Sequence, residues 1–478
     1  MPRQTDPGLA VQRVPGKPRS ARALPAPPPG PRTAPTGDGL AQDGLVQAIQ
    51  AAIDGLALNR RHALVFALCG AGLFFESLNL QLMSFVAPML AREWRIGPAL
   101  MGAAISAAIF GMLAGTYLFG ALADRIGRRP AFQLTVGIFS ALTALAGISA
   151  SFWQLAAARF GAGLGIGGSI PVETAVLAEF TPGRWRGRLM ALWAMALPLG
   201  AFLAPFCVAA MPAALGWRGL LFLGGAPAVL VLLLRRTIPE TPAYLAGRGR
   251  TAEAMQALRW IAGRAVSVPA APTDAPARVV AARIPPERLL FAEGYRESTI
   301  MSWLLYFGSF FAYYGFVLWL PALLAGYRGL ERAEVLRFVA TVAAAGFVGR
   351  AGVLLLADRV PKPTLIMGCS MLGSAALAAF ALQTGHTAML AWACAAAFCL
   401  EGTFSVLIPF VADLYPAQAR ASGVGWAGGA GRVAMALAPL AIGSLVEADV
   451  RLSILLLAGA SLSVAAVILA FRGGSARP

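Results

Sequence analysis

Between two long apolar runs the chain reads Gly120-Ala-Leu-Ala-Asp124-Arg125-Ile-Gly127-Arg128-Arg129-Pro130, which places one acid and three arginines in a short stretch. The apolar run before it ends near residue 123, and the next begins near residue 131. A link this short has no room for a domain, so it predicts a tight turn between two membrane helices. Gly120 permits a close backbone approach, Asp124 can cap a facing helix, and arginines collect on the cytoplasmic side. The stretch predicts a cytoplasmic helical hairpin, although the positive-inside bias alone would also gather its arginines.

The composition is that of a polytopic membrane protein. Of 478 residues, 58% are hydrophobic and only 13% are charged, and the mean hydropathy is +0.69, far more apolar than a single globular core requires. The net charge of +17 does not indicate nucleic acid, because the basic residues lie in loops between apolar spans. We therefore expect a lipid bilayer as surroundings and no nucleic-acid partner.

No pattern for catalysis, a metal or a cofactor is found in the sequence. The five cysteines all fall in apolar segments without a Cys-x-x-Cys pair, and the two histidines, His62 and His386, stand at predicted helix ends. A Ser/His/Asp set and a phosphate-binding loop are also missing from the sequence. We expect a protein that is not an enzyme and that binds no metal or cofactor.

The apolar stretches predict an all-α membrane protein. About twelve of them reach the roughly 20 residues that a helix needs to cross the hydrocarbon core. Basic residues in the short loops fall on one side, which predicts that both termini are cytoplasmic. Residues 45–58 carry apolar side chains at helical spacing and predict an amphipathic turn at the membrane surface. The expected organisation is a disordered cytoplasmic tail at 1–60, six-helix bundles at 61–236 and 298–473, and a central cytoplasmic loop at 237–297 between the bundles.

Two short motifs occur twice at the same distance. Leu122-Ala-Asp124-Arg125 returns as Leu356-Ala-Asp358-Arg359, and Glu179-x-x-Pro182-x-x-x-Arg186 returns as Asp413-x-x-Pro416-x-x-x-Arg420, in both cases 234 residues later. Two echoes at one period predict a duplicated six-helix unit, whose halves rock around a site near the membrane midplane.

The repeated residues predict a gate that latches the cytoplasmic side, with ordinary helix capping as the alternative explanation. The second copy lacks the Gly-Arg-Arg ending, so an asymmetric gate is expected, in which Asp124 serves conformational switching. The predicted gating residues are Gly120, Asp124, Arg125, Arg128, Arg129, Glu179, Arg186, Asp358, Arg359, Asp413 and Arg420.

The Gly-x-x-x-Asp-Arg-x-Gly-Arg-Arg order resembles the loop signature of major facilitator transporters. Other motifs are similar to those of the nicotinate-type and aromatic-acid metabolite:proton symporters, over roughly residues 63–471. Pro239-Glu240-Thr241 is similar to a signature shared with sugar porters. The resemblance implies a major facilitator fold with twelve helices in two pseudo-repeats. The motifs that carry it are Phe75-Glu76-Ser-Leu-Asn79, Arg159-Phe-Gly-Ala-Gly163, Tyr313-Tyr314-Gly315, Leu414-Tyr415-Pro416 and Gly431-Arg432.

Ionisable side chains inside the predicted spans are candidates for proton coupling, because each costs a few kcal/mol unless it is paired, hydrated or functional. Glu76 lies well inside the first span, and Glu173 lies in the fourth. Both are predicted proton sites, and a structural carboxylate bound by a neighbouring helix is the alternative for each. The resembling group has a second acid where this chain has Asn79, so a mechanism that needs both acids loses one.

The glycines between Arg159 and Glu173 predict close helix packing rather than a dinucleotide site.

Polar and aromatic side chains in the spans predict a solute site. Tyrosines of the seventh span can stack on a ring and bond to its substituents, although an interfacial aromatic belt is the alternative. The predicted substrate-binding residues are Asn79, Gln81, Arg159, Trp193, Tyr306, Tyr313, Tyr314 and Glu401. Further candidates near the pore are Arg350, Ser405 and Arg432.

These features predict a monomeric secondary transporter in the cell membrane. Its expected cargo is a small organic monocarboxylate, such as an aromatic or heterocyclic acid, moved with protons by alternating access. Sugar or polyol uptake, drug:proton export and a non-transporting solute sensor remain alternatives. Gradient-driven uptake distinguishes a transporter from a sensor.

Overall fold

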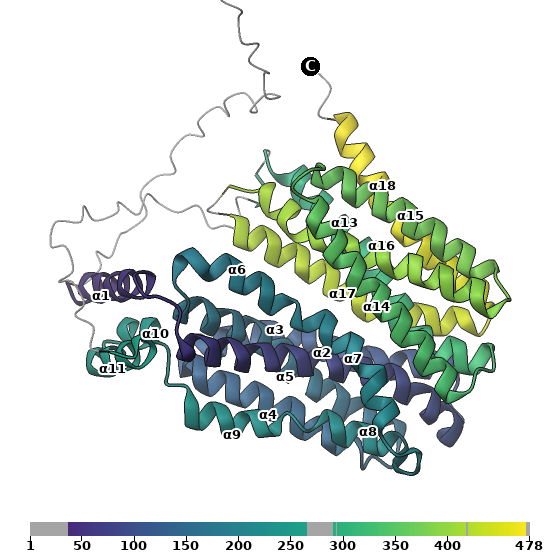
Figure 1. The fold of residues 1–478 in the computed structure, drawn as a ribbon, viewed down its shortest axis with the longest axis horizontal. Coiled ribbons are helices and arrows are strands. Elements are labelled where there is room, and N and C mark those ends of the chain that lie inside the picture. Colours follow the sequence, from purple (N-terminus) through teal and green to yellow (C-terminus); the bar gives the residue numbers. More distant parts are fainter. Residues whose placement is uncertain (1–36, 265–289, 293, 417–418, 475–478) are drawn as a thin grey trace, which may run out of the picture.

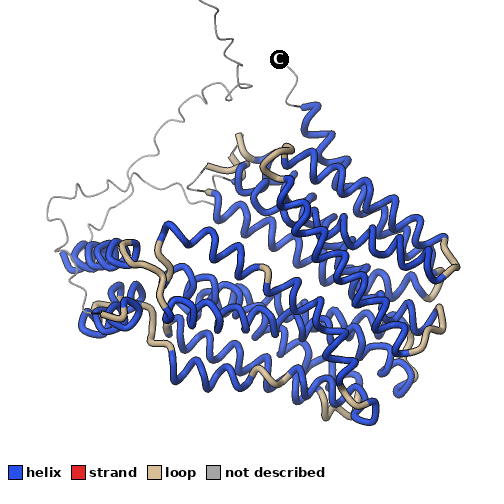
Figure 2. The backbone as a smooth tube through the Cα atoms, in the orientation of Figure 1, coloured by secondary structure: helices blue, strands red, loops and turns tan. Residues whose placement is uncertain are grey.

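The structure is a computed structural model that describes residues 37–264, 290–292, 294–416 and 419–474. Every regular element in these ranges is helical, and the long helices form two bundles that lie against each other (Figures 1 and 2). The N-terminal half contains α2 (Arg60–Trp94), α3 (Pro98–Ile126), α4 (Arg128–Ala146), α5 (Phe152–Phe180), α6 (Gly183–Ala194), α7 (Ala196–Ala210), η1 (Ala213–Leu215), α8 (Gly216–Gly224) and α9 (Ala228–Thr237). The C-terminal half contains α13 (Arg296–Ala322), η2 (Leu323–Tyr327), α14 (Arg332–Leu356), α15 (Lys362–Leu382), α16 (His386–Asp413), α17 (Arg420–Val446) and α18 (Val450–Gly474).

Ten segments among the described residues are long and apolar enough to cross a membrane, where the sequence predicted about twelve. Helix α4 is not among them. It has only 19 residues and begins with two arginines, so every stretch of it that is long enough to cross a membrane includes a charged side chain. The sixth expected span is divided into α8 and α9 around Pro227, which has no N–H to continue a helix. Both α4 and the α8–α9 pair nevertheless lie alongside the other helices of the N-terminal half (Figure 1).

The glycine run of α5 packs against α3, as the sequence predicted. A Cβ added to Gly163 would collide with the backbone of Ala108, and one added to Gly167 would collide with the backbone of Met112. Backbones that approach this closely gain van der Waals contact in a membrane, where burial of apolar groups offers little driving force. The run is therefore part of the scaffold that positions α5 beside α2 and α3.

Three short helices cover one end of the N-terminal half, and we call them the collar. They are α1 (Gly37–Asp54), α10 (Pro242–Gly247) and α11 (Thr251–Ala262), which lie together at the left of Figure 1. Residues 1–36 of the expected tail lie outside the described residues, and 37–54 form α1 instead of disordered chain. The apolar face predicted for the membrane surface packs against protein, since Ile49 and Ile53 have no exposed surface.

Polar contacts fix the collar to the bundle. The Asp54 carboxylate accepts the N–H of Gly183 at 2.7 Å, at the start of α6, and lies 3.6 Å from the Arg186 guanidinium. The Asn59 side chain caps α2 and also donates to the carbonyl of Ile261 at the end of α11 at 2.7 Å. The collar is thus bound to the starts of two helices of the bundle, α6 and α2.

We expect Ile53→Asp to release α1 from the collar. The substitution places a charge in a site with no exposed surface, and an unpaired charge there is strongly disfavoured. Hydrogen exchange should show amide protection of residues 45–54 lost, with α2 unchanged. Ala51→Asp is the matched control, because this position of α1 is exposed. Equal loss of protection in both variants would contradict docking through the Ile53 face.

Candidate functional site

Glu76 and Glu173 meet at the contact between α2 and α5. Glu76 is 1% exposed and accepts a hydrogen bond from the Ser169 hydroxyl, while Glu173 has no exposed surface. The Glu173 carboxyl packs over the α-carbon of Gly72, one turn before Glu76, and the two carboxyl groups interact electrostatically. Of the four carboxyl oxygens, only one has a hydrogen bond from the described residues. The structure therefore brings both predicted proton sites together in one buried place.

Arg159 and Asn79 form a second buried pair one turn further along α2. The Arg159 guanidinium donates to the Asn79 side-chain oxygen at 2.7 Å, and the Asn79 amide donates to Thr143 at 2.9 Å and to the carbonyl of Gly224 at 3.2 Å. Arg159 has no exposed surface, and its Nε and Nη2 atoms lack a hydrogen bond with the described residues. The pair lies among α2, α4, α5 and α8, so Arg159 is enclosed within the N-terminal half.

Tyr313 and Glu401 belong to a network in the C-terminal half. The Tyr313 hydroxyl donates to Glu401, whose other oxygen lies 3.1 Å from Nε of Arg350. Ser405 donates to the carbonyl of Arg350 at 2.6 Å. A cavity of about 20 Å³ lies between the two halves beside Gln81, Tyr313 and Glu401. It has room for about one water molecule, so the halves are closed over this part of the interface.

Arg432 of α17 faces the N-terminal half. It is half-buried, lies within electrostatic reach of Glu76, Tyr306 and Tyr314, and forms no hydrogen bond or ion pair with a described residue. Beside it, Gly431 packs on the ring of Phe310.

The rings next to Arg432 form a continuous aromatic surface on α13. The centroid of Phe310 lies 5.6 Å from that of Tyr306, with the rings stacked, and 5.6 Å from that of Tyr314. The Tyr306 side chain is buried, and its hydroxyl has no partner in the described part of the chain. A free guanidinium beside stacked rings is an arrangement that can hold an aromatic carboxylate.

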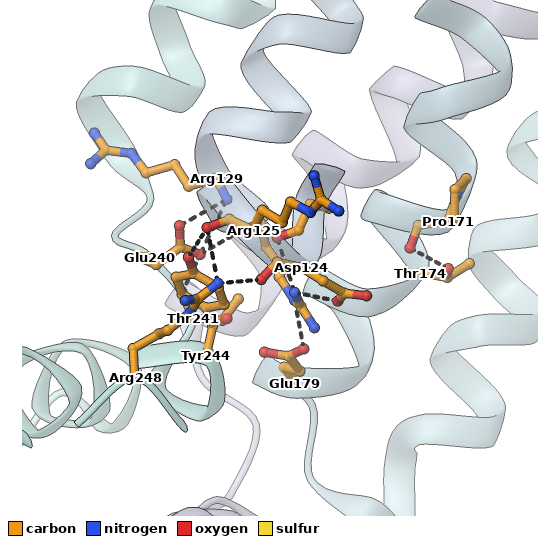
Figure 3. A network of polar contacts seen from close by, with 12 residues as sticks. Asp124, Arg125, Arg129, Pro171, Thr174, Glu179, Glu240, Thr241, Tyr244 and Arg248 are labelled. Carbon is orange, nitrogen blue, oxygen red and sulfur yellow. Dashed lines mark hydrogen bonds and ion pairs between the residues drawn. The ribbon is translucent and has the colours of Figure 1, made fainter. Parts of the chain in front are cut away.

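The loop between α3 and α4 lies in a polar network at the collar (Figure 3). Arg128 contacts the carboxylates of Asp124 at 2.8 Å and Glu179 at 3.1 Å. The Glu240 carboxylate accepts the backbone N–H groups of Arg128 at 3.0 Å and Arg129 at 3.2 Å, at the start of α4. Burial raises the pKa of Glu240, and these N–H groups oppose the shift. The α3–α4 turn is thus joined to both α5 and the segment before α10.

Two expectations for this loop need correction. Asp124 was predicted to cap a facing helix, but it pairs with the Arg128 side chain, and Glu240 caps α4. Gly120 was predicted to allow a close backbone approach, yet a Cβ added there would meet nothing within 4 Å. The end of α3 is instead bound from the collar, where the Arg125 carbonyl accepts from Tyr244 at 2.9 Å and the Asp124 carbonyl accepts from Arg248 at 2.8 Å.

Among the described residues, the second copy of the loop makes fewer ion pairs than the first. Asp413 pairs with Lys362 at 2.5 Å, and Arg420 donates to the carbonyl of Ala412 at 3.0 Å. Asp358 and Arg359 are exposed and form no ion pair with the described residues. The first copy therefore carries the denser network.

The remaining predicted residues lie near these groups. Trp193 is buried and donates to the carbonyl of Cys69, on the side of α2 that also faces Glu173. Sequence reasoning missed Ser169 and Thr143, which bond to Glu76 and Asn79. Ser169 stands one turn from Glu173 on α5, which was a usable signal, whereas nothing distinguishes Thr143 from other threonines in apolar spans.

The sequence is similar to those of named transporters. The chain is 30% identical over 404 residues to the niacin transporter NiaP of Acinetobacter baylyi, covering 83% of this chain and 90% of that protein. It is 32% identical over 388 residues to the 4-hydroxybenzoate transporter PcaK of Pseudomonas putida, covering 80% and 86%.

Solved structures share the fold at low sequence identity. The inward-open conformation of the xylose transporter XylE from Escherichia coli matches with a TM-score of 0.69 at 16% identity, covering 86% of this chain and 96% of that one. An inward-facing bacterial homologue of the lysosomal transporter Spinster matches with a TM-score of 0.68 at 16% identity, covering 87% and 98%. Residues 69–392 match the family described as Major Facilitator Superfamily. The chain therefore belongs to the Major Facilitator Superfamily.

Proposed function

We propose that this protein is a monomeric secondary transporter of the cell membrane that moves an aromatic or heterocyclic monocarboxylate together with protons. Relatives named as niacin, gallate and 4-hydroxybenzoate transporters support this class of cargo. We further propose that α4 and the α8–α9 pair complete twelve membrane crossings, and that the collar end is cytoplasmic with both termini. The arginine-rich loops at the collar end support this orientation.

The buried pair of Glu76 and Glu173 is the observation that carries proton coupling. Two carboxyl groups in one dry site cannot both be ionised without a large cost, so the pair is suited to bind and release a proton. Arg432 lies within electrostatic reach of Glu76 from the other half of the molecule. The proton site and the proposed solute site are therefore adjacent.

Arg432 provides the physical link between the two cargoes. Without solute, its positive charge favours the ionised form of Glu76. A bound carboxylate neutralises Arg432 and removes that support, so solute binding favours proton uptake, and linkage requires the reverse as well. Stacking of the solute ring on Tyr306, Phe310 and Tyr314 supplies the apolar part of the affinity. The loaded site is then close to neutral, which eases its passage between the two open states.

Uptake by proteoliposomes tests the function. With nicotinate and 4-hydroxybenzoate as probes, an inwardly directed proton gradient should drive accumulation, and a protonophore should abolish it. Binding without gradient-driven flux would contradict the transporter and favour the solute sensor. Flux of a sugar but of neither carboxylate would contradict the proposed cargo.

Asp124→Ala should slow transport several-fold while solute affinity is retained. Asp124 pairs with Arg128 at the collar end, away from the proposed solute groups, so its loss leaves Glu179 as the remaining carboxylate on Arg128 and weakens the proposed gate. Asp124 is exposed, and an ion pair at the surface contributes about 1 kcal/mol or less to stability, so folding should be preserved. Initial uptake rates and solute binding by the purified variant check this.

Lost affinity with an unchanged maximal rate would assign Asp124 to the solute site instead. Asp358→Ala is the matched control, because Asp358 forms no ion pair with a described residue and its loss should change the rate less.

A further inference from the structure

We propose that Glu447 and Arg332 form two helix-end clamps that hold the halves together at the far end, the end of the molecule opposite the collar. Each clamp is a charged side chain of the C-terminal half that bonds to exposed backbone groups at a helix end of the N-terminal half. The two act as a gate distinct from the collar network.

The first clamp closes α17 onto α3. Glu447 directly follows the last residue of α17, and its carboxylate accepts the N–H of Ala99 at 3.3 Å in the first turn of α3. A Cβ added to Gly97 would lie 2.8 Å from the same carboxylate oxygen, so the Glu447 side chain packs closely over the start of α3. A negative charge is favourable at the N-terminus of α3, where backbone N–H groups lack partners.

The second clamp closes α14 onto α7. Arg332 is the first residue of α14, and its Nη2 donates to the carbonyls of Val208 at 2.8 Å and Met211 at 3.2 Å. These carbonyls belong to the end of α7, which stops before Pro212 and leaves them without helical partners. A positive charge is favourable at such a C-terminus.

Both charges lie at the wrong end of their own helices. Glu447 follows the C-terminus of α17, and Arg332 begins α14, positions at which the helix dipole disfavours an acid and a base respectively. Each charge is favourable only toward the helix end of the opposite half. The pairing between halves therefore accounts for both residues, and capping within their own helices does not.

The two clamps are copies of one another within the repeat. Arg332 stands 234 residues after Pro98, the first residue of α3, which is the period of the collar-end motifs. The helix starts of α3 and α14 thus correspond, and so do the helix ends of α7 and α17. One copy joins α3 to α17, and the other joins α14 to α7. The duplicated fold therefore has a clamp at both corresponding places, with a negative side chain in the first and a positive one in the second.

Close packing supports the first clamp. A Cβ added to Gly102 would collide with the carbonyl of Pro439, and one added to Gly443 would come within 2.6 Å of the carbonyl of Pro98. The helices α3 and α17 therefore lie in backbone contact near Glu447. A cavity of about 390 Å³ adjoins the second clamp and is lined by Arg332 together with Phe85, Met89 and Leu336. Opening at this end must break both polar joints and separate the α3–α17 contact.

Distances between spin labels test the clamps in full-length protein without its five native cysteines. One pair, Ile148→Cys with Leu452→Cys, reports the far end, and a second pair, Arg188→Cys with Leu355→Cys, reports the collar end; all four positions are exposed. We expect Glu447→Gln or Arg332→Gln to raise the far-end-open to far-end-closed ratio about 2- to 5-fold each, the size of a helix-end charge effect. The collar-end distance should shorten in step.

Matched controls lie beside each clamp. Asp449→Asn removes an acid that bonds within its own half, to the N–H of Arg451, and Arg328→Gln removes an arginine that bonds to the carbonyl of Gln383 in its own half. Neither should change the distances. Gly102→Leu acts by wedging α3 from α17 rather than by charge, and it should open the far end even where a charge variant folds poorly. Unchanged far-end distances in Glu447→Gln, Arg332→Gln and Gly102→Leu would overturn the proposal, as would equal shifts in the controls.

Discussion

Proteoliposomes that contain Glu76→Gln should fail to accumulate a monocarboxylate against its gradient. One proton carried down a gradient of one pH unit supplies about 1.4 kcal/mol, which supports an accumulation of about tenfold. Without a titratable group at position 76 that factor should fall to about one. Exchange of labelled for unlabelled solute should continue, because the glutamine keeps the size and hydrogen-bonding capacity that Ser169 requires.

Two further variants distinguish a loss of proton coupling from a loss of folding. Glu93→Gln is the matched control, since Glu93 lies on the same helix but is exposed and paired with Arg218 at 2.9 Å. It should accumulate solute as the wild type does. Glu173→Gln tests whether the proton belongs to the pair, and an intermediate accumulation is expected if Glu173 shares it. Full accumulation by Glu76→Gln would remove Glu76 from the mechanism.

The helices were largely predictable from the sequence, because the bilayer imposes a minimum length and apolarity on each span. The span boundaries were predicted less well where a proline or a charged residue interrupts an apolar stretch. Pro227 breaks the sixth stretch, and the paired arginines at the start of α4 lower its apolarity. The collar helices were less predictable, because α10 and α11 are short and α1 packs against these two helices, which lie about 190 to 210 residues later in the chain.

The candidate site was predictable residue by residue but not as pairs. Ionisable groups in apolar spans are conspicuous, so Glu76, Glu173 and Arg159 were found directly. Their partners depend on helix rotation and tilt, which one sequence does not specify. Arg159 therefore bonds to Asn79 within one half, whereas the role expected for it at the solute fits the position of Arg432. Helix-end contacts such as that of Glu240 were hidden for the same reason.

Arg432→Gln should weaken the binding of a monocarboxylate about 10- to 100-fold, because a charge-assisted hydrogen bond contributes about 1.5–3 kcal/mol. The loss should be specific to the carboxylate. Nicotinate and nicotinamide share a ring, so competition by the amide should change little if Arg432 recognises the charge and the rings of α13 recognise the heterocycle. Arg432→Lys keeps the charge without the bidentate geometry and should recover part of the affinity.

The matched control is Arg337→Gln, which replaces an exposed arginine of α14 and should leave binding unchanged. Equal losses for acid and amide in Arg432→Gln would indicate a damaged aromatic surface and would remove Arg432 from carboxylate recognition. A selective loss for the acid, with proton-driven accumulation also reduced, would support Arg432 as the group through which solute and proton act on each other.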